Sequence, residues 1–278
     1  MSSETKTYSI EELIHLMARL RHPNTGCPWD IKQDFESIVP HTLEETYELV
    51  DAIERGDFAH LREELGDLLF QVVFYSQMAK EQNLFDFEGV IDALTAKLLK
   101  RHPHVFPEGT LHSERKAGHI PEQTAIRANW EQLKAKDRLD KGALGRLADI
   151  PLALPAITRS QKLQKRAANH GFDWPDYQPV IDKIDEELAE LREAIELNNP
   201  EHVEEELGDL IFACVNLGRH REINLETCLR RANQKFEARF RAMEVIAEKN
   251  SLDFEALSLE EKNNLWLQVK ASESLTAS

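Results

Sequence analysis

The chain has 278 residues, with 50 aspartates and glutamates against 34 lysines and arginines, which gives a formal net charge of −16. Its 41% hydrophobic and 30% charged residues exclude a disordered tail, and the lack of an apolar signal core or of an apolar run near about 18 residues predicts a cytoplasmic protein with no membrane partner. The carboxylate excess, without a dense basic stripe, excludes bulk nucleic-acid binding but leaves room for a small phosphorylated ligand held through a divalent cation.

Long stretches rich in glutamate, leucine, alanine and lysine show 3.6-residue periodicity and contain few glycines and prolines, so we predict an all-α fold. One helical unit occurs twice, because residues 43–75 align without a gap with residues 185–217 and share the run Glu-Glu-Leu-Gly-Asp-Leu. We expect two tandem helical-bundle units whose hairpins carry acidic metal sites. The predicted ranges are a first unit at 8–106, a helical and polar linker at 107–150, and a second unit at 151–271.

Each unit is expected to contain a leading helix, a helical hairpin and a following helix. Gly56 suits the turn of the first hairpin, and the pair Asn198 and Asn199 suits the turn of the second. Ser258 followed by Glu261 is typical of a capping box at the start of a last helix. In the second unit we predict helices at residues 153–169, 177–197, 201–220, 223–249 and 258–271.

Four acidic residues fall at matching heights on the second hairpin. Glu187 and Glu190 lie three residues apart before the turn near Asn198, and Glu206 and Asp209 lie three residues apart after it. Glu187 and Asp209 are equally far from the turn, as are Glu190 and Glu206, so in an antiparallel hairpin both pairs lie roughly 12–16 Å from the bend. We therefore expect four carboxylates at one level between facing helices.

Close and partly buried carboxylates repel one another strongly unless a counter-charge lies between them. Oxygen ligands without a thiolate, and without the Glu-x-x-His spacing of di-iron sites, favour Mg²⁺ over zinc or iron. His60 and His202 lie near the bends and are expected as caps or surface residues rather than metal ligands. The alternative interpretation of the acids is a solvated helix face, because a single Glu-x-x-Glu spacing is common in helices.

The first hairpin repeats the acidic pattern symmetrically about its own turn. The repetition argues against a chance arrangement of surface acids, because both the spacing and the distance from the turn recur. It predicts a second, weaker metal site formed by Glu45, Glu48, Glu64 and Asp67.

Several cations near the second quartet could hold phosphate oxygens that the metal leaves unpaired. Lys183 lies one turn before the quartet, and Lys235 and Arg239 lie one turn apart on the following helix. The alternative interpretation of these three residues is that they are ordinary surface cations, which show the same spacing on helices. Trp266 could stack on a nucleobase or simply anchor the last helix.

In combination these motifs resemble the MazG family of all-α nucleoside triphosphate pyrophosphohydrolases. The resemblance covers about residues 8–270 and implies hydrolysis of a nucleoside triphosphate to the monophosphate and pyrophosphate, a role in nucleotide-pool housekeeping, a requirement for Mg²⁺, and a homodimer of helical bundles. Besides the acidic hairpins, it rests on the segments Cys27-Pro-Trp-Asp, Arg101-His-Pro-His-Val-Phe, Ser160-Gln-Lys-Leu-Gln-Lys-Arg, Gly171-Phe-Asp-Trp and Asn233-Gln-Lys-Phe-Glu.

The resemblance also implies which residues act. The catalytic metal ligands correspond to Glu187, Glu190, Glu206 and Asp209. The nucleotide contacts correspond to Lys183, Glu186, Glu187, His202, Glu205, Asp209, Asn233, Lys235, Arg239 and Trp266. Family members with two units usually hydrolyse in the C-terminal one, and the first copy has Thr95 at the place of Asn233 and no counterpart of Trp266. We therefore assign catalysis to the second unit and a weaker or regulatory site to the first.

The sequence leaves the proton acceptor open, since a quartet member or Glu186 could take the proton of the attacking water. Two competing functions also stand beside the pyrophosphohydrolase. One is a non-catalytic, nucleotide-sensing helical interaction protein, and the other is a phosphohydrolase that removes the terminal phosphate. An HD-type phosphohydrolase is disfavoured, because no His-Asp dipeptide occurs in the chain.

Overall fold

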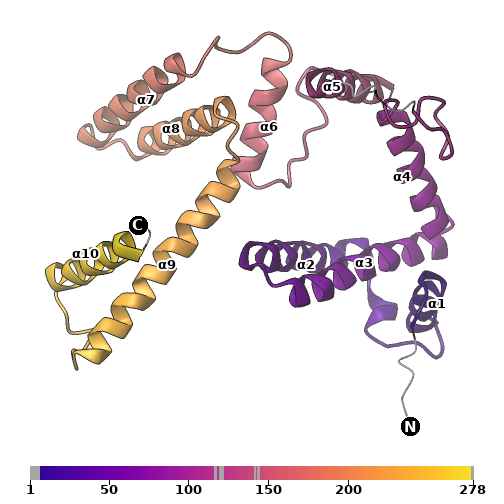
Figure 1. The fold of residues 1–278 in the computed structure, drawn as a ribbon, viewed down its shortest axis with the longest axis horizontal. Helices are drawn as coiled ribbons and strands as arrows, with labels where there is room; N and C mark the ends of the chain where they lie inside the picture. Colours follow the sequence, from indigo (N-terminus) through magenta and orange to yellow (C-terminus); the bar gives the residue numbers. More distant parts are fainter. Residues whose placement is uncertain (1–6, 116–117, 119–121, 141, 143–144, 277–278) are drawn as a thin grey trace. The chain divides into compact units, whose positions relative to one another are not determined.

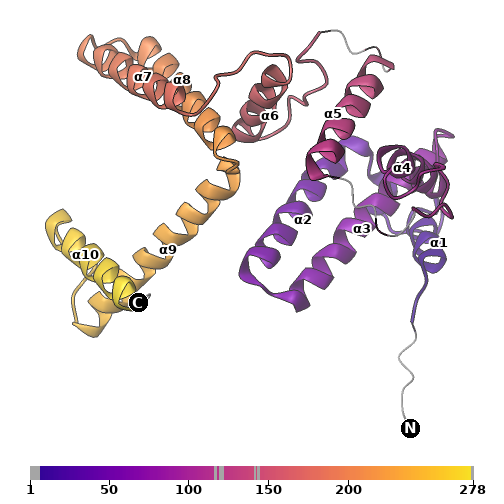
Figure 2. The same ribbon diagram turned by 45° about the horizontal axis from the view of Figure 1, so that its top comes forward.

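The computed structural model of the protein describes residues 7–115, 118, 122–140, 142 and 145–276, and every regular element within these ranges is a helix. The all-α fold predicted from the sequence is confirmed (Figures 1 and 2). The chain divides into two compact units, Met1–Ala135 and Lys136–Ser278. Among the described helices, none combines the length and the apolar character of a membrane span.

The first unit consists of a leading helix, a short 3-10 turn, a helical hairpin and a following helix. Helices α2 and α3 form the hairpin and lie side by side (Figure 1). Helix α5 (Gln123–Asp140) contains the boundary between the two units, inside the segment expected as a linker. The other elements are α1 (Ile10–Leu20), η1 (Asp30–Lys32), α2 (Phe35–Arg55), α3 (Phe58–Glu81) and α4 (Phe87–Arg101).

The core of the first unit joins α1, α2 and α3. Met17, Ile38 and Phe74 are almost completely buried there. Next to this core, the guanidinium of Arg21 at the end of α1 binds the Glu81 carboxylate at the end of α3, with Nη2 2.8 Å from Oε2. The same guanidinium donates to the backbone carbonyls of Asp30 and Gln33. This clamp fixes the segment that leads into α2.

The second unit repeats this order and adds a last helix. Helices α7 (Gln178–Glu196) and α8 (Pro200–His220) form the hairpin, and α6 (Ala156–Ala168) contacts α8 and α9 (Leu225–Lys249). Helix α10 (Leu259–Thr276) packs along α9 through Met243, Ala247, Leu265 and Val269 (Figure 1). The bounds of α7, α8 and α9 agree with the predicted ranges to within two residues.

Local chemistry explains the ends of the hairpin helices. Gly56 ends α2 in the left-handed conformation at φ +69°, and Asn198 adopts the same conformation at φ +50° after α7. Asn199 caps α8 by accepting a hydrogen bond from the His202 backbone N–H. The predicted capping box at α10 is confirmed, since Ser258 and Glu261 exchange side-chain and backbone hydrogen bonds.

An ion-pair network holds the open end of the second hairpin. The Asp173 carboxylate, in the segment before α7, accepts from Arg219 Nη1 at 2.8 Å and lies 3.1 Å from His220 Nε2. The side chain of Asn216 accepts from the same guanidinium at 2.9 Å. Because Arg219 supplies these bonds, it holds the pKa of Asp173 below its ordinary value.

Candidate metal centre

The four predicted acids of the second unit come together between α7 and α8. One ligand oxygen from each of Glu187, Glu206 and Asp209 lies within 4.8 Å of the others, a group that could hold a metal ion. Glu187 and Glu206 are buried, with 6% and 7% of each residue exposed, whereas Asp209 is exposed. The three-residue spacing on each helix, at equal distances from the turn, produces this convergence.

Glu190, the fourth predicted acid, lies close enough for its charge to act on Glu206. Burial is the main cause of the raised pKa of Glu206, and the nearby charges of Glu190 and Glu187 add to it. The cluster therefore contains carboxylates that repel one another in a partly desolvated place. Its ligands are all hard oxygen atoms, and this donor set fits Mg²⁺.

Lys183 supplies a positive charge on one side of the cluster. Its Nζ lies 2.7 Å from Glu186 Oε1 and 2.9 Å from Glu187 Oε1. These two hydrogen bonds raise the pKa of Lys183 above its ordinary value, so the ammonium stays charged at neutral pH. Glu186 is exposed and shares Lys183 with Glu187 of the quartet.

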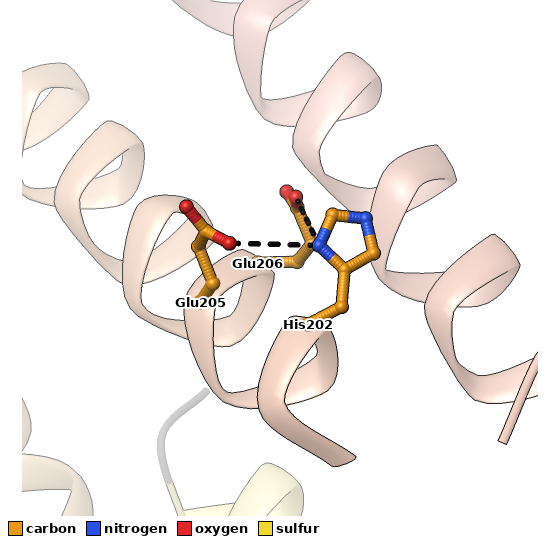
Figure 3. A group of neighbouring side chains, drawn as sticks. All are labelled: His202, Glu205 and Glu206. Atoms are coloured by element: carbon orange, nitrogen blue, oxygen red, sulfur yellow. Dashed lines mark ion pairs between the residues drawn. The ribbon is translucent and has the colours of Figure 1, made fainter. Parts of the chain in front are cut away.

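His202 lies on the side of the cluster nearer the bend. Its Nδ1 lies 3.4 Å from the buried Glu206 and 3.6 Å from the exposed Glu205, and Figure 3 shows both carboxylates on the Nδ1 side of the imidazole. These three side chains form another group whose ligand atoms could hold a metal ion. The sequence favoured a cap or surface role for this histidine, but the side-chain cap of α8 is Asn199. The signal for the contact was the His-x-x-x-Glu spacing, which both hairpins contain.

The first unit forms the corresponding cluster between α2 and α3. Ligand oxygens of Glu45, Glu48 and Glu64 lie within 4.8 Å of one another. Burial, followed by the charge of Asp67 and its neighbours, raises the pKa of Glu45. Burial also raises the pKa of Glu64, although the charge of His60 opposes the shift. His60 Nε2 lies 3.1 Å from Glu64 Oε1, which repeats the contact of the second unit.

One atom of this first cluster points to a cation. Within the described residues, Glu64 Oε2 is buried and has no hydrogen-bond partner. A buried, unpaired carboxylate oxygen is costly, and a bound divalent ion would satisfy it. The donor set of the first cluster thus fits a metal as well as that of the second.

The two clusters differ in the residue that precedes them by one turn. The position of Lys183 is taken by His41 in the first unit. The His41 ring lies 3.7 Å from Glu44 through Nδ1 and contacts Trp29 edge to face at 5.8 Å between ring centroids. The first cluster therefore has no lysine at this position.

The predicted nucleotide-binding residues of α9 and α10 form a group of their own. The Arg239 guanidinium lies 5.5 Å from the ring centroid of Trp266, and Phe236 contacts the same indole at 5.4 Å between ring centroids. Lys235 and Asn233 are exposed on α9. In the described part of the chain, Arg239 contacts Glu273 and Trp266, and Trp266 contacts Phe236. All of these residues lie on α9 and α10, so the structure does not bring the group against the quartet.

Sequence reasoning missed the acidic partner of this group. Glu273 on α10 binds Arg239, with Oε2 2.7 Å from Nη2. The two residues are 34 positions apart, and no local motif links them. Only the packing of α10 along α9 brings them together.

Both hairpins of this chain are similar in sequence to a known protein family. The family model for the MazG nucleotide pyrophosphohydrolase domain matches residues 33–106 and 176–243. A protein of Escherichia coli K12 named nucleoside triphosphate pyrophosphohydrolase is 48% identical over 268 residues, which cover 95% of this chain and 98% of that protein. A Thermotoga maritima protein, named nucleoside triphosphate pyrophosphohydrolase/pyrophosphatase MazG, is 40% identical over 263 residues, or 95% and 96% of the two chains.

This chain also matches part of a Mycobacterium tuberculosis protein named nucleoside triphosphate pyrophosphohydrolase, to which it is 34% identical over 164 residues. That alignment covers 58% of this chain and 46% of the other. The family model covers the two segments that carry the acidic quartets, and the two longer relatives align along nearly their whole length. The chain belongs to the MazG nucleotide pyrophosphohydrolase family and carries the family's domain in two tandem copies.

Proposed function

We propose that this protein is a nucleoside triphosphate pyrophosphohydrolase that converts an NTP or dNTP and water to the monophosphate and diphosphate. The observation that carries the proposal is the convergence of Glu187, Glu206 and Asp209 between α7 and α8, with Glu190 beside them. Relatives that match over almost the whole chain bear the name of this activity. Nucleotide-pool housekeeping in the cytoplasm is the role we propose, and the three cysteines of the chain are all free thiols, as expected in a reducing compartment.

Mg²⁺ is the metal that we propose for this site. Glu187, Glu190, Glu206 and Asp209 would hold it, because their oxygen ligands and their mutual repulsion both favour a hard divalent cation. When bound, Mg²⁺ supplies positive charge to the triphosphate and lowers the pKa of water.

The protein's own residues would orient the substrate and move the proton. Lys235 and Arg239 are the donors that we propose for the phosphate oxygens of the leaving diphosphate, and since the structure does not bring Arg239 against the quartet of its own chain, this role requires the α9 and α10 group to meet a quartet in the assembled dimer. Trp266 offers a flat surface on which a nucleobase can stack. A quartet carboxylate or Glu186 would accept the proton of the water that attacks the α-phosphorus. No covalent nucleophile is required for this displacement.

We assign catalysis to the second unit and a weaker or regulatory metal site to the first. The second unit has Lys183 next to its quartet, and it has Asn233 and Trp266 on its following helices. The first unit has His41 and Thr95 at the positions of Lys183 and Asn233. Its acids are retained, but these nucleotide-binding side chains are not.

A homodimer is the assembly that we propose. Three apolar residues on the first hairpin are exposed, and their equivalents on the second hairpin are exposed as well, with exposed fractions between 39% and 56%. Apolar side chains at equivalent places of a repeated hairpin indicate a surface that another helical pair covers. These residues are Ile53, Leu65 and Leu69 in the first unit and Ile195, Leu207 and Ile211 in the second.

Product identity tests the function directly. Purified protein should convert ATP, and a panel of other NTPs and dNTPs, to the monophosphate and diphosphate when Mg²⁺ is present, as measured by ion-exchange chromatography. A nucleoside diphosphate and inorganic phosphate as the products would instead indicate an enzyme that removes the terminal phosphate. Nucleotide binding without any product, independent of Mg²⁺, would support the non-catalytic sensor. Sedimentation equilibrium of the same preparation tests the dimer.

A further inference from the structure

The carboxylate of Glu273 lies among the cations proposed to bind phosphate. Its Oε1 and Oε2 accept from Arg239 Nε at 3.2 and 3.0 Å, and Oε2 also accepts from Nη2 at 2.7 Å. The positive charges of Lys235 and Lys270 act on the same carboxylate. Three cations of α9 and α10 therefore surround one acidic group.

This arrangement resembles the way in which a phosphate is held. A carboxylate and a phosphate offer similar oxygen pairs to a guanidinium, which binds either of them along one edge. Only 17% of the Arg239 side chain is exposed, and its other neighbour is the Trp266 ring. The Nε and Nη2 donors of Arg239 cannot serve Glu273 and a triphosphate at full strength at the same time.

Glu273 is placed to leave when a ligand arrives. Its side chain is 45% exposed and belongs to the last part of α10, whereas Arg239 is fixed on the long α9 helix. Exposed ion pairs contribute only about 0.2–1 kcal/mol, so a multiply charged phosphate can displace such a carboxylate.

We propose that Glu273 is an internal competitor of the substrate, which occupies Lys235 and Arg239 in the free enzyme and is displaced when the triphosphate binds. This inference rests on the proposed phosphate-binding role of these two cations. Glu273 then sets the apparent affinity for nucleotide without touching the reacting atoms. Diphosphate, as a product that uses the same cations, should compete with it in the same way.

The test is Glu273→Gln, which keeps the shape of the side chain and removes its charge. We expect KM for ATP and the inhibition constant of diphosphate both to fall by about 1.4- to fivefold, the range that the loss of an exposed ion pair predicts, with kcat unchanged. Both effects should shrink at high salt, where the charges are screened. Equal or higher values of KM and of the inhibition constant would overturn the proposal. A raised KM with a lowered kcat would show that Glu273 positions Arg239 for catalysis.

Glu237→Gln is the matched control. Glu237 forms an exposed ion pair with Arg241 on the same helix, at 2.6 Å between Oε1 and Nη2, so its partner is not one of the cations proposed to bind phosphate. This variant should leave KM unchanged. Thermal unfolding of both variants would show that they fold as the wild type does.

Calorimetric titration with inorganic diphosphate separates this inference from the proposed function. If the wild type hydrolyses no nucleotide, the proposed function fails, and tighter diphosphate binding by Glu273→Gln would still support the internal competitor. If the wild type is active and Arg239→Ala weakens diphosphate binding while Glu273→Gln does not strengthen it, the proposed function stands and the competitor is refuted.

Discussion

The two units of this chain share their acids and differ in the residue one turn before them. Glu45, Glu48, Glu64 and Asp67 gather between α2 and α3 as their counterparts gather between α7 and α8, and in both units a histidine one turn away contacts the buried glutamate. The difference lies in what surrounds the acids, because Lys183 is replaced by His41. Each hairpin by itself thus forms an acidic group that could hold a metal, whereas the nucleotide binding that we propose depends on residues around it.

The units also fix the open ends of their hairpins with ion pairs of opposite polarity. In the first, Arg21 from the leading helix binds Glu81 on α3. In the second, Asp173 from the segment before α7 binds Arg219 on α8. Both units thus have an ion pair between the segment that enters the hairpin and the hairpin's second helix, but the acidic and basic partners are exchanged. Either arrangement of charges holds the entering segment against the hairpin.

The largest expected effect comes from neutralising one acid of the second unit's quartet. Glu190→Gln or Asp209→Asn should lower kcat by at least about a hundredfold, the scale of losing one essential electrostatic contact, because the metal loses a charged ligand. The fold should persist, since removing a charge relieves repulsion within the cluster in the absence of metal. Steady-state hydrolysis of ATP with Mg²⁺, together with circular dichroism, measures both.

The counterparts Glu48→Gln and Asp67→Asn in the first unit sharpen this comparison. They should leave kcat within about twofold and reduce only the number of Mg²⁺ or Mn²⁺ ions bound, as measured by calorimetry. A loss of turnover equal to that of the second-unit variants would refute the assignment of catalysis to the second unit.

A smaller effect is expected at the position where the units diverge. Lys183→Met removes one cation next to Glu187 and should raise KM for ATP by about three- to tenfold, the cost of one charge-assisted hydrogen bond of about 1 kcal/mol. His41→Met in the first unit serves as the control and should leave KM unchanged. If both variants gave the same KM as the wild type, Lys183 would have no role in binding the nucleotide.

The smallest effect concerns stability and its dependence on pH. Arg219 lowers the pKa of Asp173, so the ionised carboxylate stabilises the folded state above the ordinary pKa of about 3.9, and this contribution is lost as pH falls through the lower folded value. Asp173→Asn should therefore reduce the free energy of unfolding by about 1–2 kcal/mol at pH 7, with the difference narrowing below about pH 4. Urea unfolding at several pH values measures it.

Glu81→Gln is the matching variant in the first unit. Burial raises the pKa of Glu81, but the hydrogen bonds from Arg21 and Gln77 outweigh it and lower the pKa overall. Because the Glu81 side chain is 35% exposed, solvent screens its ion pair, and the loss should be smaller than that of Asp173→Asn. The reverse order would show that the clamp of the first unit is the stronger one.

The sequence predicted the hairpins and their acids because both depend on local spacing. Gly56 and Asn198 do adopt the left-handed turn conformation, and the mirrored spacing about each turn brings the acids to one level. Contacts between distant segments were not predictable in this way. Glu273 reaches Arg239, and Asp173 reaches Arg219, only because of how helices pack, and neither pair shares a motif.

The apolar stripe of α8 illustrates what periodicity alone does not show. The stripe that includes Leu207 and Ile211 has the periodicity of a buried helix face, yet these residues are 47% and 48% exposed. A two-helix hairpin covers only the side on which its helices meet, so periodicity shows which face is apolar but not what covers it.

The short bends of the hairpins have a consequence for how such a chain can vary. A single residue inserted in α8 between the bend and Glu206 would rotate the part of the helix that follows by about 100° and advance it by about 1.5 Å. Glu206 would then turn away from Glu187, although each helix would remain intact. The number of helical residues between the bend and the acids therefore sets the geometry of the cluster, and substitutions in this stretch are tolerable where insertions and deletions are not.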